Sequence, residues 1–140
     1  MTVPLMCVLG AVVWTALLAA SVVGVRGWLV LRGEAIDAFP AEVPHGGPRY
    51  RRLLRAHLNA TENLPIFAAV CLVGDGAGVF HEVLDVSAVV WVAARVVQTT
   101  IHIASPSPAA VALRATAFSV QVLAVLTHAV AIVALYLGRP

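Results

Sequence analysis

MTVPLMCVLGAVVWTALLAASVVGV, residues 1–25, contains no charged side chain. A helix needs about 20 mostly apolar residues to cross the hydrocarbon core of a bilayer, so this run is long enough. A cleaved signal peptide would have a basic segment before a shorter apolar core, and the run has neither. Arg26, Trp28 and Arg32 follow it, and such side chains are typical of a membrane interface. The run therefore predicts an uncleaved transmembrane helix over about residues 3–32.

The overall composition also indicates a membrane protein. Of the 140 residues, 61% are hydrophobic and 11% are charged, whereas a soluble domain carries about 25% charged residues. The net charge of +2 is too small and too scattered to predict a nucleic-acid partner. Cys7 and Cys71 both lie in apolar runs, so we expect small buried side chains, with neither a disulfide nor a metal site.

Turn and cap residues divide the rest of the chain into three more helices. Residues 33–47 are polar and rich in proline and glycine, which predicts a long loop, and Pro48 suits the first turn of the next helix. A glycine-rich turn follows residue 73, and Ser107-Pro108 predicts the start of a last helix. We predict an all-α, integral membrane four-helix bundle that forms one domain over residues 1–140. Its helices are expected at about residues 3–32, 48–73, 84–104 and 108–137.

The arginines predict how the bundle is oriented. Most of them lie in the first loop and at the start of the second helix, whereas residues 75–85 contain three acidic residues and no arginine. Basic loops stay on the cytoplasmic side of a membrane. We therefore expect the first and third loops in the cytoplasm and both chain termini on the far side.

Four polar residues at spacings of three, four and three form one row on the predicted second helix: Arg52, Arg55, Asn59 and Glu62. Charged groups inside a membrane helix are costly and normally face a bundle interior or a cavity. Arginine is also the side chain best shaped to bind a carboxylate through two hydrogen bonds. The row suits a small zwitterionic ligand that carries carboxylates and an amine. The alternative to a ligand site is that the arginines only anchor the helix at the membrane interface. This alternative is favoured for Arg49 and Arg51 only.

The third and fourth helices carry polar rows of their own. These rows consist of Arg95, Gln98, Thr99 and His102, and of Arg114, Gln121 and His128. At a rise of about 1.5 Å per residue, six residues fall in the cytoplasmic half of the bilayer: Arg55, Asn59, Glu62, Arg95, His102 and Arg114. A self-satisfied polar network, such as a buried Glu62–Arg95 ion pair, is the alternative to a ligand site. His128 lies deeper and alone, which favours a packing role.

The run RLLRAHLNATEN, residues 52–63, followed by Pro65 and Phe67, is similar to the signature of the MAPEG family, the membrane-associated proteins in eicosanoid and glutathione metabolism. The segment from Arg114 to Phe118 also resembles the start of that family's fourth helix. The resemblance covers nearly the whole chain, and it is greatest to microsomal glutathione transferases and their bacterial relatives.

The resemblance implies a homotrimer that binds glutathione, or another low-molecular-weight thiol, between adjacent subunits near the cytosolic face. It also implies a lipophilic small-molecule co-substrate that enters from the membrane lipid. The residues expected to bind the thiol are Arg52, Arg55, Asn59, Glu62 and Arg95, to which we add His102 from the third helix. Arg114 would lie beside the sulfur as the catalytic residue, because an arginine stabilises a thiolate whose pKa is ordinarily about 8.5.

Two departures narrow the expected activity. Ala115 and Phe118 stand where the prostaglandin synthase branch of the family has Ser and Tyr. We therefore predict a thiol-dependent transferase or peroxidase that acts on lipophilic electrophiles in the bacterial inner (plasma) membrane. A catalytically silent relative that binds lipid or another membrane protein is the alternative. A small multidrug-type transporter is less favoured, because such transporters need an acidic residue in the first helix and residues 3–25 contain none.

Overall fold

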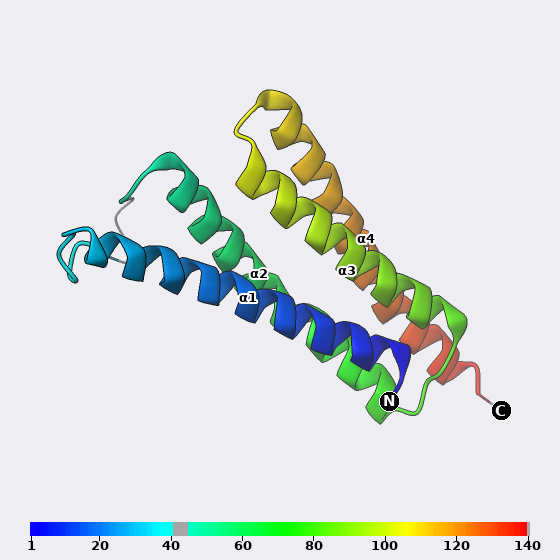
Figure 1. Ribbon diagram of the computed structural model, residues 1–140. Coiled ribbons are helices and arrows are strands. Elements are labelled where there is room, and N and C mark those ends of the chain that lie inside the picture. The colour runs from blue at the N-terminus through cyan, green and yellow to red at the C-terminus, as the bar shows by residue number, and fades with distance from the viewer. Residues whose placement is uncertain (41–44, 140) are drawn as a thin grey trace.

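The computed structural model describes residues 1–40 and 45–139, so residues 41–44 of the predicted first loop lie outside the described part of the chain. The regular structure of the described residues is helical, without a strand. The elements in chain order are α1 (Val3–Leu31), α2 (Pro48–Gly76), α3 (Glu82–Ala104) and α4 (Pro108–Leu137), as Figure 1 shows. The all-α, four-helix architecture predicted from the sequence is therefore confirmed.

Proline and side-chain caps set where the helices begin. α1, α2 and α4 each have a proline in their first two positions, where a missing N–H costs nothing. The Ser107 hydroxyl accepts a hydrogen bond from the Ala110 N–H at 3.2 Å, as the Ser-Pro pair predicted. α3 starts differently, because the Nδ1 atom of His81 accepts from the Val83 N–H at 3.2 Å.

The turn between α2 and α3 is shorter than the sequence predicted. α2 continues through Gly74 to Gly76, and α3 begins at Glu82. Gly78, with a φ of 64°, follows α2 in the left-handed conformation that favours glycine. Its N–H donates to the Asp75 carbonyl at 3.0 Å. Gly74 and Gly76 therefore remain helical, and Gly78 forms the turn that ends α2.

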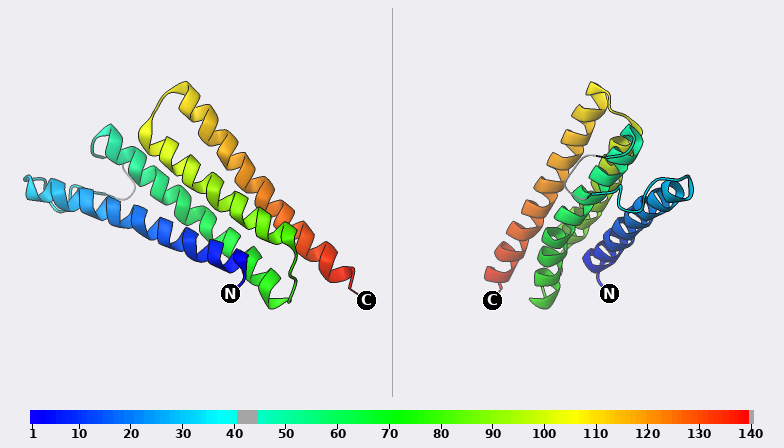
Figure 2. Two further views of the ribbon diagram at one scale, coloured as in Figure 1. Left: turned by 45° about the vertical axis from the view of Figure 1, so that its right-hand side comes forward. Right: turned by 90° about the vertical axis from the view of Figure 1, so that its left-hand side faces the viewer.

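The helices pack as two pairs. α3 and α4 run side by side along most of their length, and α1 packs on α2 and α3 without touching α4. The C-terminal half of α1 leans away from the other three helices (Figures 1 and 2). At that end the Arg26 Nε atom donates to the Tyr50 hydroxyl at 2.6 Å, which ties α1 to the start of α2.

The core is built from small residues around one aromatic pair. Phe67 of α2 stacks on Trp91 of α3 with ring centroids 4.0 Å apart and planes at 4°. The other buried members of this core are Ala11, Cys71, Ala88 and Ala124. Small residues at helix contacts let membrane helices approach closely. Of the two free cysteines, Cys71 is buried and Cys7 is half-buried.

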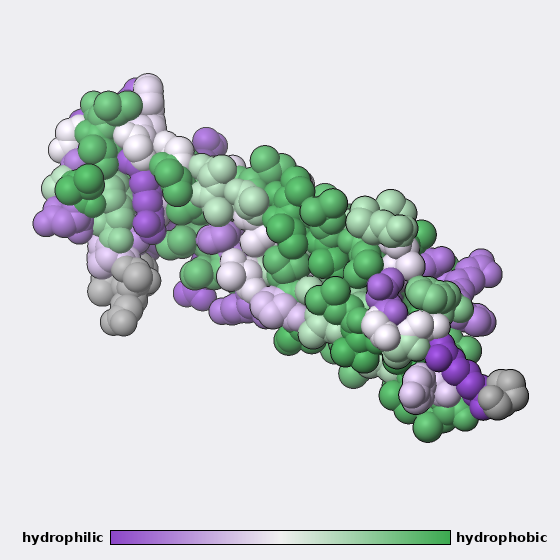
Figure 3. Space-filling model, turned by 90° about the horizontal axis from the view of Figure 1, so that it is seen from below, coloured by the Kyte–Doolittle hydropathy of each residue, from purple (hydrophilic) through white to green (hydrophobic). Residues whose placement is uncertain are grey.

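The face of the molecule drawn in Figure 3 is mostly apolar along its middle. Hydrophobic residues dominate the central part of the face in Figure 3, and hydrophilic residues gather toward its two ends. Within the described residues, three helices are long and apolar enough to cross a membrane: α1, α3 and α4. α2 is as long as α1, but its first half carries the charged side chains predicted to form the site.

Candidate functional site

Burial divides the predicted polar row of α2 into two parts. Arg52 and Asn59 are half-buried and turn toward α3, whereas Arg55 and Glu62 are exposed. The Arg52 Nε atom donates to the carbonyl of Ile103 at 3.0 Å, across the end where α2 begins and α3 ends. Around the helix, Arg52 and Asn59 lie at one edge of the row and Arg55 and Glu62 at the other, so only part of the row faces the bundle.

Arg95 anchors a buried polar cluster, the Arg95 cluster, which also contains Gln98 and Gln121. Arg95 is 3% exposed, and its Nη1 atom donates to Gln98 Oε1 at 2.9 Å. The Gln121 Nε2 atom donates to the same oxygen at 3.1 Å, so this cluster joins α3 to α4. A longer 3.4 Å contact from Nη1 reaches the carbonyl of Asn59 on α2. The Trp91 ring lies 5.0 Å from the guanidinium, within the range of a cation–π interaction.

The Arg95 cluster is not fully satisfied. Within the described structure, Nε and Nη2 of Arg95 and Oε1 of Gln121 are buried without a hydrogen-bond partner. No ion pair joins Arg95 to Glu62 among the described residues, so the Glu62–Arg95 pair considered as the alternative to a ligand site does not form. Unpaired donors in a buried guanidinium are costly unless an acceptor reaches them. Arg95 therefore has two N–H donors available for a further acceptor.

A groove of about 280 Å³ adjoins the Arg95 cluster at Gln98, and we call it the polar groove. Three residues predicted for the site line it, one from each of α2, α3 and α4: Asn59, His102 and Arg114. Its other walls are Gln98, Val111, Ala115 and Phe118. Arg114 is half-buried there, and none of the hydrogen bonds among the described residues involves its guanidinium. The structure thus brings together residues from three helices.

The polar groove is electropositive. The charges of Arg114, Arg55 and Arg52 all act on His102, which places three arginines around the end of α3. No acidic side chain neutralises them through an ion pair within the described residues. A concentration of unpaired arginines attracts anions, and it favours carboxylates in particular because the guanidinium matches their geometry.

Two contributors to the site were not identified as such from the sequence. Gln98 lines the polar groove and accepts from both Arg95 and Gln121. The positions of Gln98 and Gln121 in the polar rows of α3 and α4 could be seen in the sequence. Spacing alone, however, does not show which amide accepts a hydrogen bond from which donor. Trp91, four residues before Arg95, was recognisable as a possible partner on the same helical face.

A second groove continues along α2 and α4, and we call it the apolar groove. It has a volume of about 200 Å³, and Asn63 and Gln121 lie at its polar side. Its remaining lining is hydrophobic: Ile66, Trp91, Val122, Val125 and Leu126. Asn63 is one helical turn from Asn59, and Gln121 is two turns from Arg114, so the two grooves follow the same helices.

Comparison with known proteins gives one match. The model of the MAPEG family matches residues 4–134, which is nearly the whole chain. A search of curated proteins finds no match.

Proposed function

Because the chain belongs to the MAPEG family and is therefore an integral membrane protein, we propose that it is a thiol-dependent transferase or peroxidase that acts on lipophilic electrophiles. One observation carries this proposal most strongly. Arg114 lies half-buried in the polar groove without a hydrogen-bond partner among the described residues, beside Asn59 and His102. A guanidinium in this state is suited to stabilise an anion, and a thiolate is the anion that this chemistry requires.

The residues around the groove fit glutathione or a similar low-molecular-weight thiol. Glutathione carries two carboxylates and an amine in addition to its thiol. Arg52 and Arg55 supply guanidinium groups for the carboxylates, and Asn59 supplies an amide. Arg95 is linked to the groove through Gln98, which lines the groove and accepts from the Arg95 Nη1 atom. Glu62 supplies the negative charge that an amine requires, and His102 completes the wall of the groove.

The chemistry needs little from the protein beyond charge and position. A thiol with a pKa of about 8.5 is mostly protonated at neutral pH, and a nearby arginine shifts it toward the reactive thiolate. In the transferase reaction the sulfur forms a bond to an electrophilic carbon, the leaving group departs with the electron pair, and the thiol proton passes to water. In the peroxidase reaction two thiols become a disulfide while a hydroperoxide is reduced to an alcohol and water.

The apolar groove supplies a place for the lipophilic co-substrate. Its walls are mainly aliphatic and aromatic, and it opens on the surface of α2 and α4 beside the polar groove. Ligand sites are usually apolar with a few polar groups that fix the orientation. Asn63 and Gln121 serve as those groups here. A hydrophobic substrate dissolved in the bilayer reaches this groove without crossing water.

A homotrimer completes the site. Arg55 and Glu62 are exposed on the single subunit, although their helix, α2, belongs to an integral membrane protein. In a lone subunit these two charged side chains would face lipid. Charged side chains directed at lipid cost several kcal/mol, about 2.5–3.5 on insertion scales. A neighbouring subunit that packs against α2 removes them from lipid and closes the open side of the polar groove.

The proposed activity is tested with purified protein in detergent. Conjugation of a chromogenic aryl halide is followed by absorbance, with glutathione and then with other low-molecular-weight thiols. We expect turnover in the wild type and at least about a 10-fold loss in Arg114→Ala, since a lost charge-assisted bond is worth about 1.5–3 kcal/mol. Arg32→Ala is the matched control, because Arg32 is exposed at the end of α1 and stacks on Trp28. Absence of turnover with every thiol would instead favour a catalytically silent relative that binds lipid or another membrane protein.

A further inference from the structure

Two glutamine side chains connect the polar groove to the apolar groove. Gln98 of α3 lines the polar groove, and Gln121 of α4 lines the apolar groove. Both are buried, at 6% and 2% exposed, and the Gln121 Nε2 atom donates to Gln98 Oε1 at 3.1 Å. This one hydrogen bond therefore joins the walls of the two grooves.

The partners of Gln121 determine which way its amide is turned. Its Nε2 atom also lies 3.1 Å from the carbonyl oxygen of Ala117, one turn earlier in α4. A backbone carbonyl only accepts, so the group beside it must be the N–H2 group of Gln121. That group has two hydrogens, one for the Ala117 carbonyl and one for Gln98 Oε1. Gln121 is therefore fixed as a donor toward Gln98.

The amide of Gln98 is fixed in the same way. Its Oε1 atom lies 2.9 Å from Nη1 of Arg95, and a guanidinium only donates, so the oxygen must lie on that side. The opposite orientation of the amide would place its N–H2 group against the N–H groups of Arg95 and Gln121. With two donors on its oxygen, Gln98 therefore turns its own N–H2 group away from both partners.

The N–H2 group of Gln98 is both unpartnered and accessible. No hydrogen bond among the described residues uses its Nε2 atom, yet this atom is not one of the buried polar atoms that lack a partner. The atom therefore reaches the surface, and the groove that Gln98 lines is the polar groove. The other polar walls of this groove are Asn59, His102 and Arg114. The groove thus has an oriented neutral donor in addition to its arginine.

The orientation of Gln98 matters for the proposed ligand. Carboxylate and amide oxygens of a thiol compound such as glutathione are acceptors, so they match the nitrogen of Gln98 and not its oxygen. A side chain that is already held in its binding orientation loses less conformational entropy when a ligand arrives. Gln121 contributes to this orientation although it does not line the polar groove.

We propose that Gln121 is a positioning residue for the thiol site: it holds Gln98 so that Gln98 Nε2 donates to an acceptor oxygen of the bound thiol compound. The inference rests on the proposed function and adds to it a residue from outside the polar groove. Arg95 holds the same oxygen of Gln98, so loss of Gln121 weakens the orientation without abolishing it. The effect of Gln121 on thiol binding should disappear when Gln98 itself is replaced.

Calorimetric titration of the full-length, detergent-solubilised protein with glutathione, without co-substrate, tests the proposal. Gln121→Met keeps the length of the side chain and removes its bond to Gln98, so the Kd for glutathione should rise about 3- to 10-fold. Gln98→Leu removes the donor itself and should raise this Kd by about 10-fold or more. Thr116→Val is the control on the same helix and should bind like the wild type, because Thr116 is exposed and its hydroxyl bonds only to the Ala112 carbonyl.

The double variant Gln98→Leu/Gln121→Met separates positioning from a general effect on the fold. If Gln121 acts through Gln98, the double variant should have the same Kd as Gln98→Leu alone. Losses that add in the double variant would assign Gln121 to the stability of the fold and overturn the proposal. Circular dichroism checks that each variant retains its helix content.

Gln98→Glu provides a second background for the same comparison should Gln98→Leu not fold. It keeps an oxygen for both Arg95 and Gln121 but replaces the donor nitrogen by a second, equivalent oxygen, so orientation no longer matters. Glutathione binding should weaken by about 10-fold or more, and added Gln121→Met should have no further effect.

Failure of the inference and failure of the proposed function give different results. A wild type that does not bind glutathione would remove glutathione as the proposed ligand, and the inference with it. Wild-type binding that Gln121→Met leaves as unchanged as Thr116→Val does would overturn the inference alone, and the proposed function would stand.

Discussion

Arg114 and Arg55 differ in their surroundings, and this difference gives them separate roles in the proposed reaction. Arg114 lies half-buried in the polar groove, and Arg55 is exposed on α2. In the proposed site Arg55 binds a carboxylate of the thiol substrate, and this carboxylate does not change between the bound state and the transition state. Arg55→Ala should therefore mainly raise the apparent KM for the thiol. The expected rise is about 10- to 100-fold, from a lost charge-assisted hydrogen bond. Arg114→Ala should mainly lower kcat, because Arg114 stabilises the reactive form.

Steady-state kinetics with varied thiol separates these two effects. An unchanged kcat in Arg114→Ala, with only KM affected, would assign Arg114 to simple carboxylate binding. Arg32→Ala serves again as the control for a lost surface charge.

Gln98 is the residue on which the Arg95 cluster depends. Its Oε1 atom accepts from both Arg95 and Gln121, so Gln98→Leu removes one hydrogen bond from each of these two side chains. Arg95 Nη1 is then left with only its 3.4 Å contact to the Asn59 carbonyl. A lost hydrogen bond to a charged group is worth about 1.5–3 kcal/mol. We predict a clear fall in the thermal unfolding midpoint in detergent. Thr100→Val is the control, since Thr100 is exposed and its hydroxyl bonds only to the Val96 carbonyl of its own helix. Equal midpoints for the two variants would argue against the cluster as a structural element.

At the scale of the helices, close packing depends on alanines at their contacts. Ala88 of α3 is 0% exposed and lies in the core with residues of the other three helices. Ala88→Leu adds three carbon atoms where no space exists, and overpacking typically costs about 1–3 kcal/mol. Ala93→Leu on the exposed face of the same helix should have little effect on the unfolding midpoint in detergent. A harmless Ala88→Leu would mean that α3 is not packed tightly against its neighbours.

The sequence was sufficient to predict the helices but not the side-chain contacts between them. Apolar runs bounded by proline, glycine and a Ser-Pro cap predicted the order of the helices, and only the α2–α3 turn differed, because Gly74 and Gly76 remain helical. The positions of Asn59, His102 and Arg114 in one groove followed from the topology. The exposure of Arg55 and Glu62 did not, because residue spacing does not show which neighbour covers each side of a helix.

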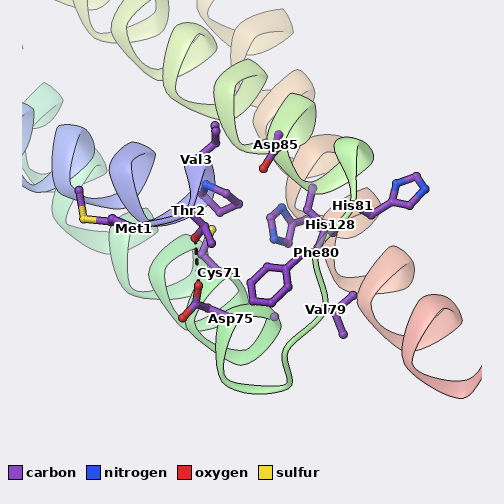
Figure 4. A pocket seen from close by; sticks show the side chains of 13 residues that line it. Met1, Thr2, Val3, Cys71, Asp75, Val79, Phe80, His81, Asp85 and His128 are labelled. Carbon is purple, nitrogen blue, oxygen red and sulfur yellow. Dashed lines mark hydrogen bonds between the residues drawn. The ribbon is translucent and has the colours of Figure 1, made fainter. Parts of the chain in front are cut away.

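A cavity of about 370 Å³ at the end of the bundle where α1 begins, α2 ends and α3 begins (Figure 4) was not predicted, for a related reason. Asp75, Asp85 and His128 come from three different helices, and no regular spacing connects them in the sequence. His128 was expected to pack in the interior. The structure shows it buried and bonded to Ser87, in agreement with that interpretation, and it also lines this cavity.

At the scale of the whole molecule, the proposed orientation is open to direct measurement. We propose that the α3–α4 connection faces the cytoplasm and that the end of α4 faces the far side. Single cysteines at Pro106 and Gly138, both exposed, report on the two sides when Cys7 and Cys71 are replaced by serine. A membrane-impermeant maleimide added to intact cells should label Gly138→Cys and spare Pro106→Cys. The reverse pattern would invert the proposed orientation.

Assembly is the second property at this scale. In the proposed site a neighbouring subunit covers the exposed Arg55 and Glu62 and closes the open side of the polar groove. Native mass spectrometry in a mild detergent should therefore show a trimer. A monomer that retained full conjugation activity would contradict a site shared between subunits.

The central claim is that Arg114 stabilises the thiolate of a bound thiol. Its most direct test is the ultraviolet absorbance of the thiolate when detergent-solubilised protein is titrated with glutathione at a series of pH values. We predict a thiolate band in the wild type that persists well below the ordinary thiol pKa of about 8.5. In Arg114→Ala the loss of positive charge removes the stabilisation, so the ionisation should move up toward that ordinary value. An unchanged thiolate band in Arg114→Ala, at saturating thiol, would contradict the account.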